Sequence, residues 1–249
     1  MTYPKIKRII RSHASSDGDG VRIQRLALFN ESMTDPFLMI DELRSVNPDD
    51  YIGGFPPHPH RGMETLTYLK QGALEHKDHL GNRGMIHSGG AQWMSAGRGI
   101  IHSEMPSLEA NGLHGFQLWI NLPARNKMKN PDYRDVPATE IPMLEGNGWS
   151  ANVIAGQWQL DNQESSGPLM NLAADAAILD LSLNAGSEVR VTVDAAMATM
   201  AFVYEGSIDL EKEHPERCLL VFSDGIDALN LTSQQGARVL LLSGTPIRE

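Results

Sequence analysis

The chain has 249 residues, of which 41% are hydrophobic and 21% charged, so it can form either two domains of roughly 100 to 130 residues or one large β domain. Its formal net charge of -10 opposes broad contact with nucleic acid or with an anionic membrane surface. No stretch approaches the roughly 18 consecutive apolar residues that a membrane-spanning helix needs. We therefore expect a protein that binds neither nucleic acid directly nor a membrane.

The first residues and the cysteine content bear on the compartment. Residues 1–11 contain basic side chains but no following apolar core of the kind found in a signal peptide. The single cysteine, Cys218, cannot form an intramolecular disulfide, and in the apolar run 217–222 it is expected to be a buried small hydrophobe. A cytoplasmic location follows as the expectation.

Short segments with alternating or dense apolar residues recur along the chain, separated by Gly, Asn, Asp or Pro, and few segments have a helical period. Strands are predicted at 116–122, 178–183, 189–193, 201–204 and 238–242, with a turn at 184–186. This pattern is typical of an all-β sandwich or barrel. The polar stretch 126–133 contains a proline and predicts a connector, so we place a domain boundary near residue 130.

Histidine is concentrated in the first half, where seven of the nine lie between His58 and His114. Side chains two residues apart on an extended strand point to the same face, so His58 and His60 can reach one ion. His102 and Glu104 repeat this spacing beside a Gly-Arg-Gly turn. If the two segments pair, four ligands converge.

Imidazoles with one carboxylate suit Fe, Mn, Cu, Ni or Zn better than Mg or Ca, which prefer oxygen ligands. Three further histidines lie in a polar, turn-rich stretch and are predicted to be solvated hairpin residues. They are His76, His79 and His87.

Two segments, 58–65 and 92–104, resemble the two cupin motifs in the form peculiar to the pirin family. The resemblance extends through 76–78 and 115–123, and it is loose beyond about residue 135. It implies an all-β fold of two tandem antiparallel cupin barrels, that is, double-stranded β-helices. Residues 1–130 would form an N-terminal metal-binding barrel, and residues 131–249 a C-terminal cupin-like barrel without metal ligands.

The resemblance also implies a ligand set and a metal. The general cupin motif uses a glutamate four residues after the second histidine, where Glu64 stands, and strand parity allows either carboxylate. The pirin form assigns the fourth ligand to Glu104, with His58, His60 and His102, and leaves Glu64 as a supporting or structural residue. Iron, as Fe(II), is the implied metal, and Mn, Ni, Cu, Zn and Co are the alternatives.

Pirins are reported to act as quercetin 2,3-dioxygenases, so the resemblance implies an oxidoreductase whose substrates are a flavonol-like aromatic molecule and O2. Glu104 is the expected catalytic base for the 3-hydroxyl of the flavonol. No residue is identifiable as a flavonol-specific contact. The alternative function is a regulatory protein that binds a transcriptional or metabolic protein partner according to the redox state of its metal.

Overall fold

The computed structural model describes residues 4–29, 32–107, 112–210 and 212–249. Strands dominate these residues, and among them helix occurs only as short 3-10 turns at Ser32–Thr34, Pro48–Asp50, Ala124–Asn126, Ala138–Glu140 and Ala173–Asp175. None of the helices described has the length and apolarity required to cross a membrane. The expected all-β class is confirmed.

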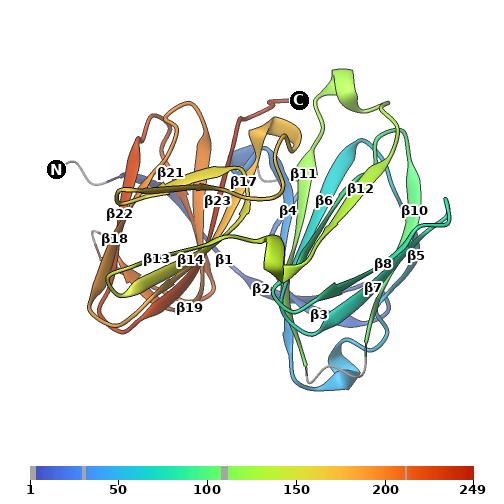
Figure 1. Ribbon diagram of the computed structural model, residues 1–249, viewed down its shortest axis with the longest axis horizontal. Helices are drawn as coiled ribbons and strands as arrows, with labels where there is room; N and C mark the ends of the chain where they lie inside the picture. Colours follow the sequence, from blue (N-terminus) through green and yellow to red (C-terminus); the bar gives the residue numbers. More distant parts are fainter. Residues whose placement is uncertain (1–3, 30–31, 108–111, 211) are drawn as a thin grey trace. The chain divides into compact units, whose positions relative to one another are not determined.

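Contacts group the chain into two compact units (Figure 1). We call one the N-terminal barrel, which comprises the described residues within 13–31 and 37–140 together with residue 249. We call the other the C-terminal barrel, which comprises the described residues within 1–12, 32–36 and 141–248.

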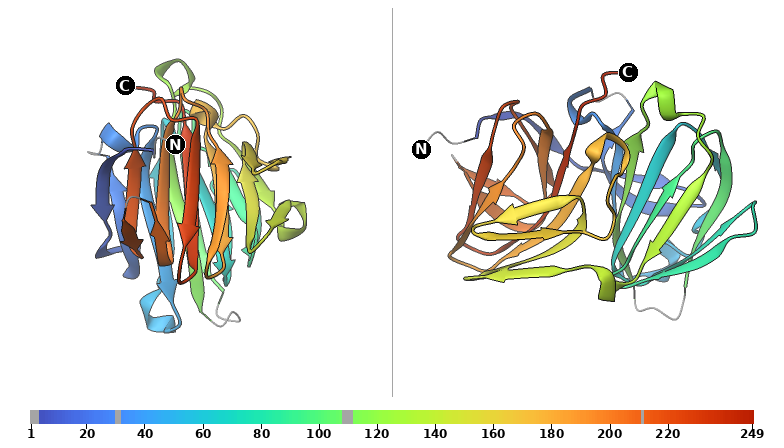
Figure 2. Two further views of the ribbon diagram at one scale, coloured as in Figure 1. Left: turned by 90° about the vertical axis from the view of Figure 1, so that its left-hand side faces the viewer. Right: turned by 45° about the horizontal axis from the view of Figure 1, so that its top comes forward.

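The N-terminal barrel consists of a seven-stranded and a four-stranded antiparallel sheet. The larger sheet has the order β12-β9-β6-β11-β4-β3-β2, and the smaller has the order β5-β10-β7-β8. The strands are β2 His13–Asp17, β3 Val21–Leu28, β4 Phe37–Ser45, β5 Phe55–His60, β6 Met63–Gln71, β7 Ala73–Asp78, β8 Arg83–His87, β9 Ala91–Ser95, β10 Ile100–Pro106, β11 Leu113–Asn121 and β12 Asp132–Val136. The two layers of this barrel, in blue to green, can be followed in Figure 1 and in the right-hand view of Figure 2.

The interior of the N-terminal barrel is apolar on one side of the metal-ligand candidates. Leu43 and Leu69 from the larger sheet pack with Leu74 and Ile86 from the smaller one. All four are buried, and burial of each such side chain contributes roughly 1.5 to 3 kcal/mol. This packing holds the two sheets face to face and thereby positions β5 and β10 over β6 and β11.

The C-terminal barrel is built from one extensively paired sheet with the main order β13-β14-β17-β23-β19-β22-β18-β15-β16, to which β1, β20 and β21 are added. Its strands are β1 Ile6–Arg11, β13 Met143–Gly146, β14 Trp149–Ala155, β15 Gln157–Leu160, β16 Gln163–Ser166, β17 Ala177–Leu183, β18 Ser187–Thr192, β19 Ala198–Asp209, β20 Glu213–Pro215, β21 Cys218–Phe222, β22 Ala228–Ser233 and β23 Ala237–Gly244.

Alternation explains why these segments are strands. In β18 the β-branched residues Val189 and Val191 are buried while their neighbours are more exposed, and Val191 faces Leu229 of β22. The predicted turn before β18 is present, with the Ser187 amide donating to the Asn184 carbonyl oxygen at 3.2 Å and Gly186 at a φ of 76°. The five strands predicted from alternation all lie within observed strands, apart from residues at their ends.

The grouping of residues into barrels differs from the ranges inferred from sequence. β12 lies beyond residue 130, yet it pairs with β9 and extends the sheet of the N-terminal barrel. β1 lies within the range 1–130 that was assigned to the N-terminal barrel, yet it pairs with β21 of the C-terminal barrel. Backbone pairing between segments distant in sequence produces both differences, and local composition carries no signal of it.

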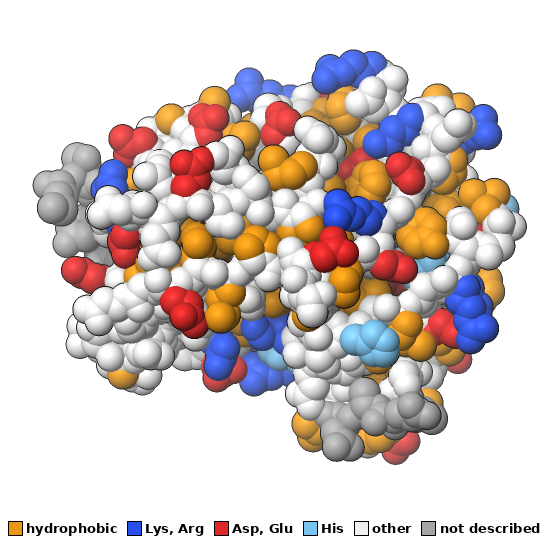
Figure 3. Space-filling model, viewed as in Figure 1, with side chains coloured by type: hydrophobic (Ala, Val, Ile, Leu, Met, Phe, Trp, Pro, Cys, Tyr) orange, Lys and Arg blue, Asp and Glu red, His pale blue; other side chains and the backbone are white. Residues whose placement is uncertain are grey.

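Acidic and basic side chains are interspersed on the face seen in Figure 3, and neither kind gathers there into a broad single-sign surface. The absence of direct nucleic-acid binding stays a prediction from the net charge.

Candidate metal centre

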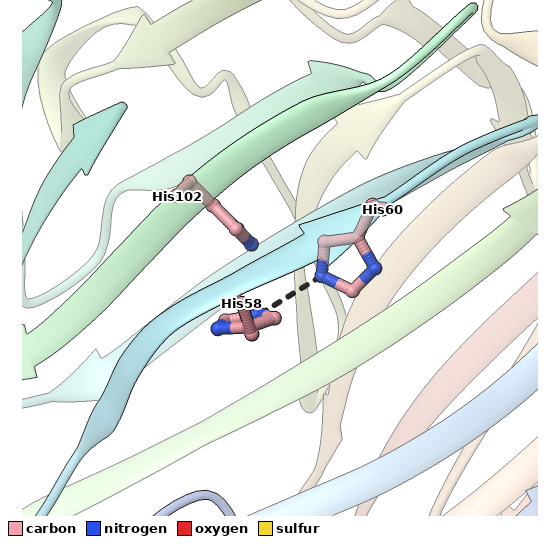
Figure 4. A group of neighbouring side chains, drawn as sticks. All are labelled: His58, His60 and His102. Carbon is pink, nitrogen blue, oxygen red and sulfur yellow. Dashed lines mark hydrogen bonds between the residues drawn. The ribbon is translucent and has the colours of Figure 1, made fainter. Parts of the chain in front are cut away.

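Three histidines converge in the N-terminal barrel, two from β5 and one from β10 (Figure 4). These strands are antiparallel neighbours, and His102 lies directly opposite His58 in the register. One ring nitrogen from each of His58, His60 and His102 lies within 4.8 Å of the others. The predicted convergence of the two segments therefore occurs, because strand parity places both β5 histidines on the face that meets His102.

The hydrogen bonds of His58 define which of its nitrogens is free. Its Nδ1 lies 2.8 Å from the carbonyl oxygen of Pro56, which can only accept, so Nδ1 carries the hydrogen. The Nε2 lone pair of the neutral ring then faces the Nε2 of His60 at 2.9 Å. Without a metal ion, this contact requires a hydrogen on His60 Nε2, and an ion between the two nitrogens would replace that hydrogen.

His102 provides an independent sign that the group suits a cation. Its side chain is 2% exposed, and its Nε2 is buried without a hydrogen-bond partner among the described residues. A buried polar atom without a partner is costly in a folded protein. A transition metal coordinated by imidazole nitrogens would satisfy it, so the residues present fit a metal of this class.

Burial keeps two of the three rings neutral. It lowers the pKa of His60 to about 4, with repulsion from His58 adding to the effect. It lowers the pKa of His102 to about 2, again with repulsion from the neighbouring imidazoles. Both rings consequently retain a lone pair for a metal at neutral pH.

These shifts predict that acid destabilises the metal-free protein. Because the unfolded chain binds protons at both histidines below about pH 6.5 and the folded chain does not, the free energy of unfolding falls as pH decreases from 6.5 toward 4. Each histidine contributes a slope of about 1.4 kcal/mol per pH unit. Urea unfolding of the metal-free protein across this range measures the slope. A double variant, His60→Gln with His102→Gln, is expected to have a shallower slope, and an unchanged slope would contradict the assignment.

Glu104 lines the same cavity as His58 and His60, although its carboxylate does not belong to the group formed by His58, His60 and His102. It is 3% exposed, and Thr67 Oγ1 lies 3.0 Å from its Oε1. Gln117 Nε2 donates to its Oε2 at 3.4 Å, and Gln117 Oε1 lies 2.6 Å from Thr67 Oγ1. The carboxylate thus sits in a triangle of polar groups beside the three rings.

Glu64, the alternative carboxylate, occupies a different environment. Its two oxygens accept from Trp93 Nε1 at 2.9 Å and from Lys129 Nζ at 2.8 Å, and its side chain is completely buried. It does not line the cavity that Glu104 lines. The strand-parity argument fails for Glu64 because β5 ends at His60 and a turn at Gly62, with a φ of 70°, separates it from β6.

Replacing Glu64 by Gln is expected to leave metal binding unchanged and to lower stability. The variant removes the charge that pairs with Lys129, whose side chain is 38% exposed and partly solvated, so we expect a loss of about 1 to 2 kcal/mol. Metal content and thermal unfolding of the same preparation test both parts. A variant without metal but with wild-type stability would make Glu64 the better ligand candidate.

The cavity beside the histidines has a volume of about 690 Å³, which lies in the range that holds a small organic molecule. Trp119 forms part of its wall and packs edge-on against His60, with ring centroids 5.1 Å apart. Phe29, which also lines it, contacts Trp119 at 5.5 Å. An aromatic wall therefore runs from the exposed side chain of Phe29 through Trp119 to the ligand candidate His60.

A row of polar side chains crosses the larger sheet on the cavity side. Arg25, Asp41, Gln117, Thr67 and Gln92 lie directly opposite one another on successive strands β3, β4, β11, β6 and β9. Arg25 binds Asp41 through two nitrogens, at 3.0 and 2.7 Å. Burial raises the pKa of Asp41, and the Arg25 guanidinium partly offsets this rise. The row supports Glu104 through Gln117 and Thr67.

The comparisons with known proteins agree with this geometry. The family model described as Pirin matches residues 20–120, and the one described as Pirin C-terminal cupin domain matches residues 178–249. A Vibrio cholerae protein, provisionally named as a quercetin 2,3-dioxygenase, is 43% identical over 98% of this chain and 87% of its own. The chain belongs to the pirin family. A pirin-like protein from Caulobacter vibrioides is 41% identical over 100% of this chain and 90% of its own.

Two solved structures share the fold. The quercetin 2,3-dioxygenase from Acinetobacter baumannii superimposes with a TM-score of 0.89 and 28% identity over 100% of this chain and 89% of that one. The bacterial pirin YhhW from Escherichia coli, solved in complex with nickel(II), has a TM-score of 0.69 and 21% identity over 96% of this chain and 99% of its own. The expected cupin architecture is thereby confirmed for this pirin family member.

Sequence reasoning missed three residues of the site. His76 was predicted to be solvated, and this was wrong, because it is fully buried with its Nδ1 3.3 Å from His102 Nδ1. Thr67 and Gln117 were not singled out at all. Each is a polar residue at a buried position of a largely apolar strand, and this pattern could have marked them as site residues. Alternation alone, however, does not reveal which face of a strand is buried.

Proposed function

We propose that this pirin family member is an iron-dependent dioxygenase that acts on quercetin-like flavonols. The observation that supports it most is the group of three histidines, two of which, His58 and His60, line a cavity of about 690 Å³ with an aromatic wall. The relatives provisionally named as quercetin 2,3-dioxygenases and the dioxygenase fold neighbour support the same reaction class.

In this proposal His58, His60, His102 and Glu104 hold the metal. Iron in that position supplies redox chemistry that couples an electron-rich substrate to O2. Mn, Ni, Cu, Zn or Co are compatible with the same donor atoms, so the donor set supports a transition metal and the family resemblance supports iron.

The cavity contributes binding and exclusion of water. Trp119 and Phe29 offer flat apolar surface on which the ring system of a flavonol can pack. Ile23 and Leu43 continue the apolar lining. A ligand held there displaces water from the reacting centre, which strengthens its electrostatic contacts with the polar groups around Glu104.

Glu104 is proposed as the base that takes the proton of the 3-hydroxyl. Thr67 Oγ1 has one hydrogen but lies within reach of both Glu104 Oε1 and Gln117 Oε1, so one of these contacts lacks a hydrogen while Glu104 is ionised. A proton on Glu104 Oε1 would complete a closed ring from Glu104 to Thr67, from Thr67 to Gln117 and from Gln117 back to Glu104. If the amide nitrogen and oxygen of Gln117 are exchanged, the three contacts of the triangle still lack one hydrogen while Glu104 is ionised. The triangle therefore provides a place for the abstracted proton.

The experiment that tests the proposal combines elemental analysis of freshly purified protein with anaerobic addition of a flavonol and subsequent admission of O2. We expect about one iron per chain, together with coupled oxygen uptake and carbon monoxide release. Iron without turnover would favour the regulatory alternative, in which affinity for a protein partner follows the oxidation state of the metal. Absence of any transition metal, even after reconstitution, would overturn the metal centre.

A further inference from the structure

A fourth histidine, His76, lies against His102, one of the four proposed ligands, but is not a proposed ligand itself. It belongs to β7, directly opposite Glu104 of β10, and its side chain is 0% exposed. Its ring centroid is 4.8 Å from that of His102. Burying the polar ring of His76 removes two ring nitrogens from water, which costs free energy, whereas an apolar side chain would fill the same space without that cost.

The contact between the two rings constrains their hydrogens. Nδ1 of His76 lies 3.3 Å from Nδ1 of His102, so one of these nitrogens must donate and the other accept. If His76 donated, His102 Nδ1 would be the acceptor and the hydrogen of the neutral ring would sit on Nε2. That hydrogen would block Nε2, the atom that has no hydrogen-bond partner among the described residues. If His102 donates, its Nε2 keeps a lone pair.

The ring of His76 is held in place by its surroundings. Tyr133 of β12 stacks on it with centroids 5.8 Å apart and planes inclined by 11°. Within the described residues, His76 Nε2 has no hydrogen-bond partner of its own and is buried. The site therefore retains a buried nitrogen that costs stability, which argues for a role of His76 toward His102 rather than toward the fold.

We propose that His76 is a positioning residue whose Nδ1 accepts the Nδ1 hydrogen of His102 and so directs the Nε2 lone pair of His102 at the metal. This inference rests on the proposed metal centre. The Pro56 carbonyl oxygen does the same for His58 through its Nδ1. Partners of this kind orient metal-bound histidines and select their tautomer, and here a neutral imidazole takes the part usually played by a carboxylate or a carbonyl.

Titration of the metal-free protein with cobalt(II), read by the visible d–d absorption of the bound ion, tests the proposal. His76→Leu removes the acceptor at similar volume, and His76→Asn keeps an acceptor near the position of Nδ1. We expect the leucine variant to bind cobalt(II) about 10- to 100-fold more weakly with an altered spectrum. The asparagine variant is expected to recover most of the affinity and the wild-type spectrum. Thermal unfolding of the metal-free variants checks that the fold is intact.

The outcomes separate this inference from the function on which it rests. If the wild-type protein bound no cobalt(II), the metal centre itself would fail. If the wild type bound it and the leucine variant bound equally tightly with the same spectrum, only the role of His76 would be overturned. Equal weakening in the asparagine and leucine variants would also overturn it, because the acceptor would then be irrelevant. Should the leucine variant not fold, His76→Phe, which keeps a ring against Tyr133, takes its place in the comparison.

Discussion

Replacing Glu104 by Gln is expected to abolish oxygen consumption in the presence of a flavonol. The amide has nearly the shape of the carboxyl group and can still contact Thr67 and Gln117, but it cannot accept the 3-hydroxyl proton and is a poorer metal ligand. Loss of a positioned general base alone costs about 100- to 10,000-fold in rate. Oxygen uptake and carbon monoxide release under the conditions used for the wild type measure the effect.

The control for this variant is Glu140→Gln in the same barrel, where an exposed carboxylate pairs with Arg134 at the surface. It is expected to retain full turnover, because surface ion pairs contribute little and Glu140 does not line the cavity. Full turnover in the Glu104 variant, with its iron content unchanged, would rule out Glu104 as the base. Loss of iron together with turnover would instead point to its role as a ligand.

Replacing His102 by Ala is expected to remove the metal. In the proposed centre His102 supplies the imidazole from β10, opposite the two histidines of β5, so its loss leaves two imidazole nitrogens and the carboxylate of Glu104. The affinity should fall by more than the roughly 10- to 100-fold that loss of a supporting partner costs. Iron content after purification and a cobalt(II) titration of the metal-free protein both measure this.

His87→Ala is the matched control for that experiment, because His87 lies on β8 of the same barrel but is exposed and outside the group. It is expected to bind metal like the wild type. If the His102 variant retained about one iron per chain, the metal would have to be held by other residues, and the proposed set would be wrong.

Much of the site was accessible from the sequence because its geometry is local. Two histidines separated by one residue share a face on any extended strand, and the spacing of His102 and Glu104 repeats this relation. The resemblance to pirins then connected the two segments. In the structure β5 and β10 are hydrogen-bonded neighbours, so the side chains that share a face within each segment also meet one another across the two strands.

The prediction for His76 was wrong because the environment of its side chain depends on distant segments. His76 lies in a polar stretch that reads as a solvated hairpin, yet Tyr133 of β12 and His102 of β10 enclose it. For Glu64, to which the pirin resemblance gave a supporting role, the structure adds a turn at Gly62 that separates it from β5 and a hydrogen bond from Lys129. Neither environment leaves a trace in the residues immediately around it.

By itself the sequence determined the all-β class, the alternation within each strand and the spacing of two between the candidate ligands of each segment, because these depend on backbone geometry over a few residues. Tertiary structure alone decided which face of β11 meets the cavity, and so brought Gln117 to Glu104. It also decided that β1 joins the C-terminal barrel and β12 the N-terminal one. The physical reason is that pairing between strands depends on which edges meet in the folded chain, and a one-residue change of register would move every side chain to the other face.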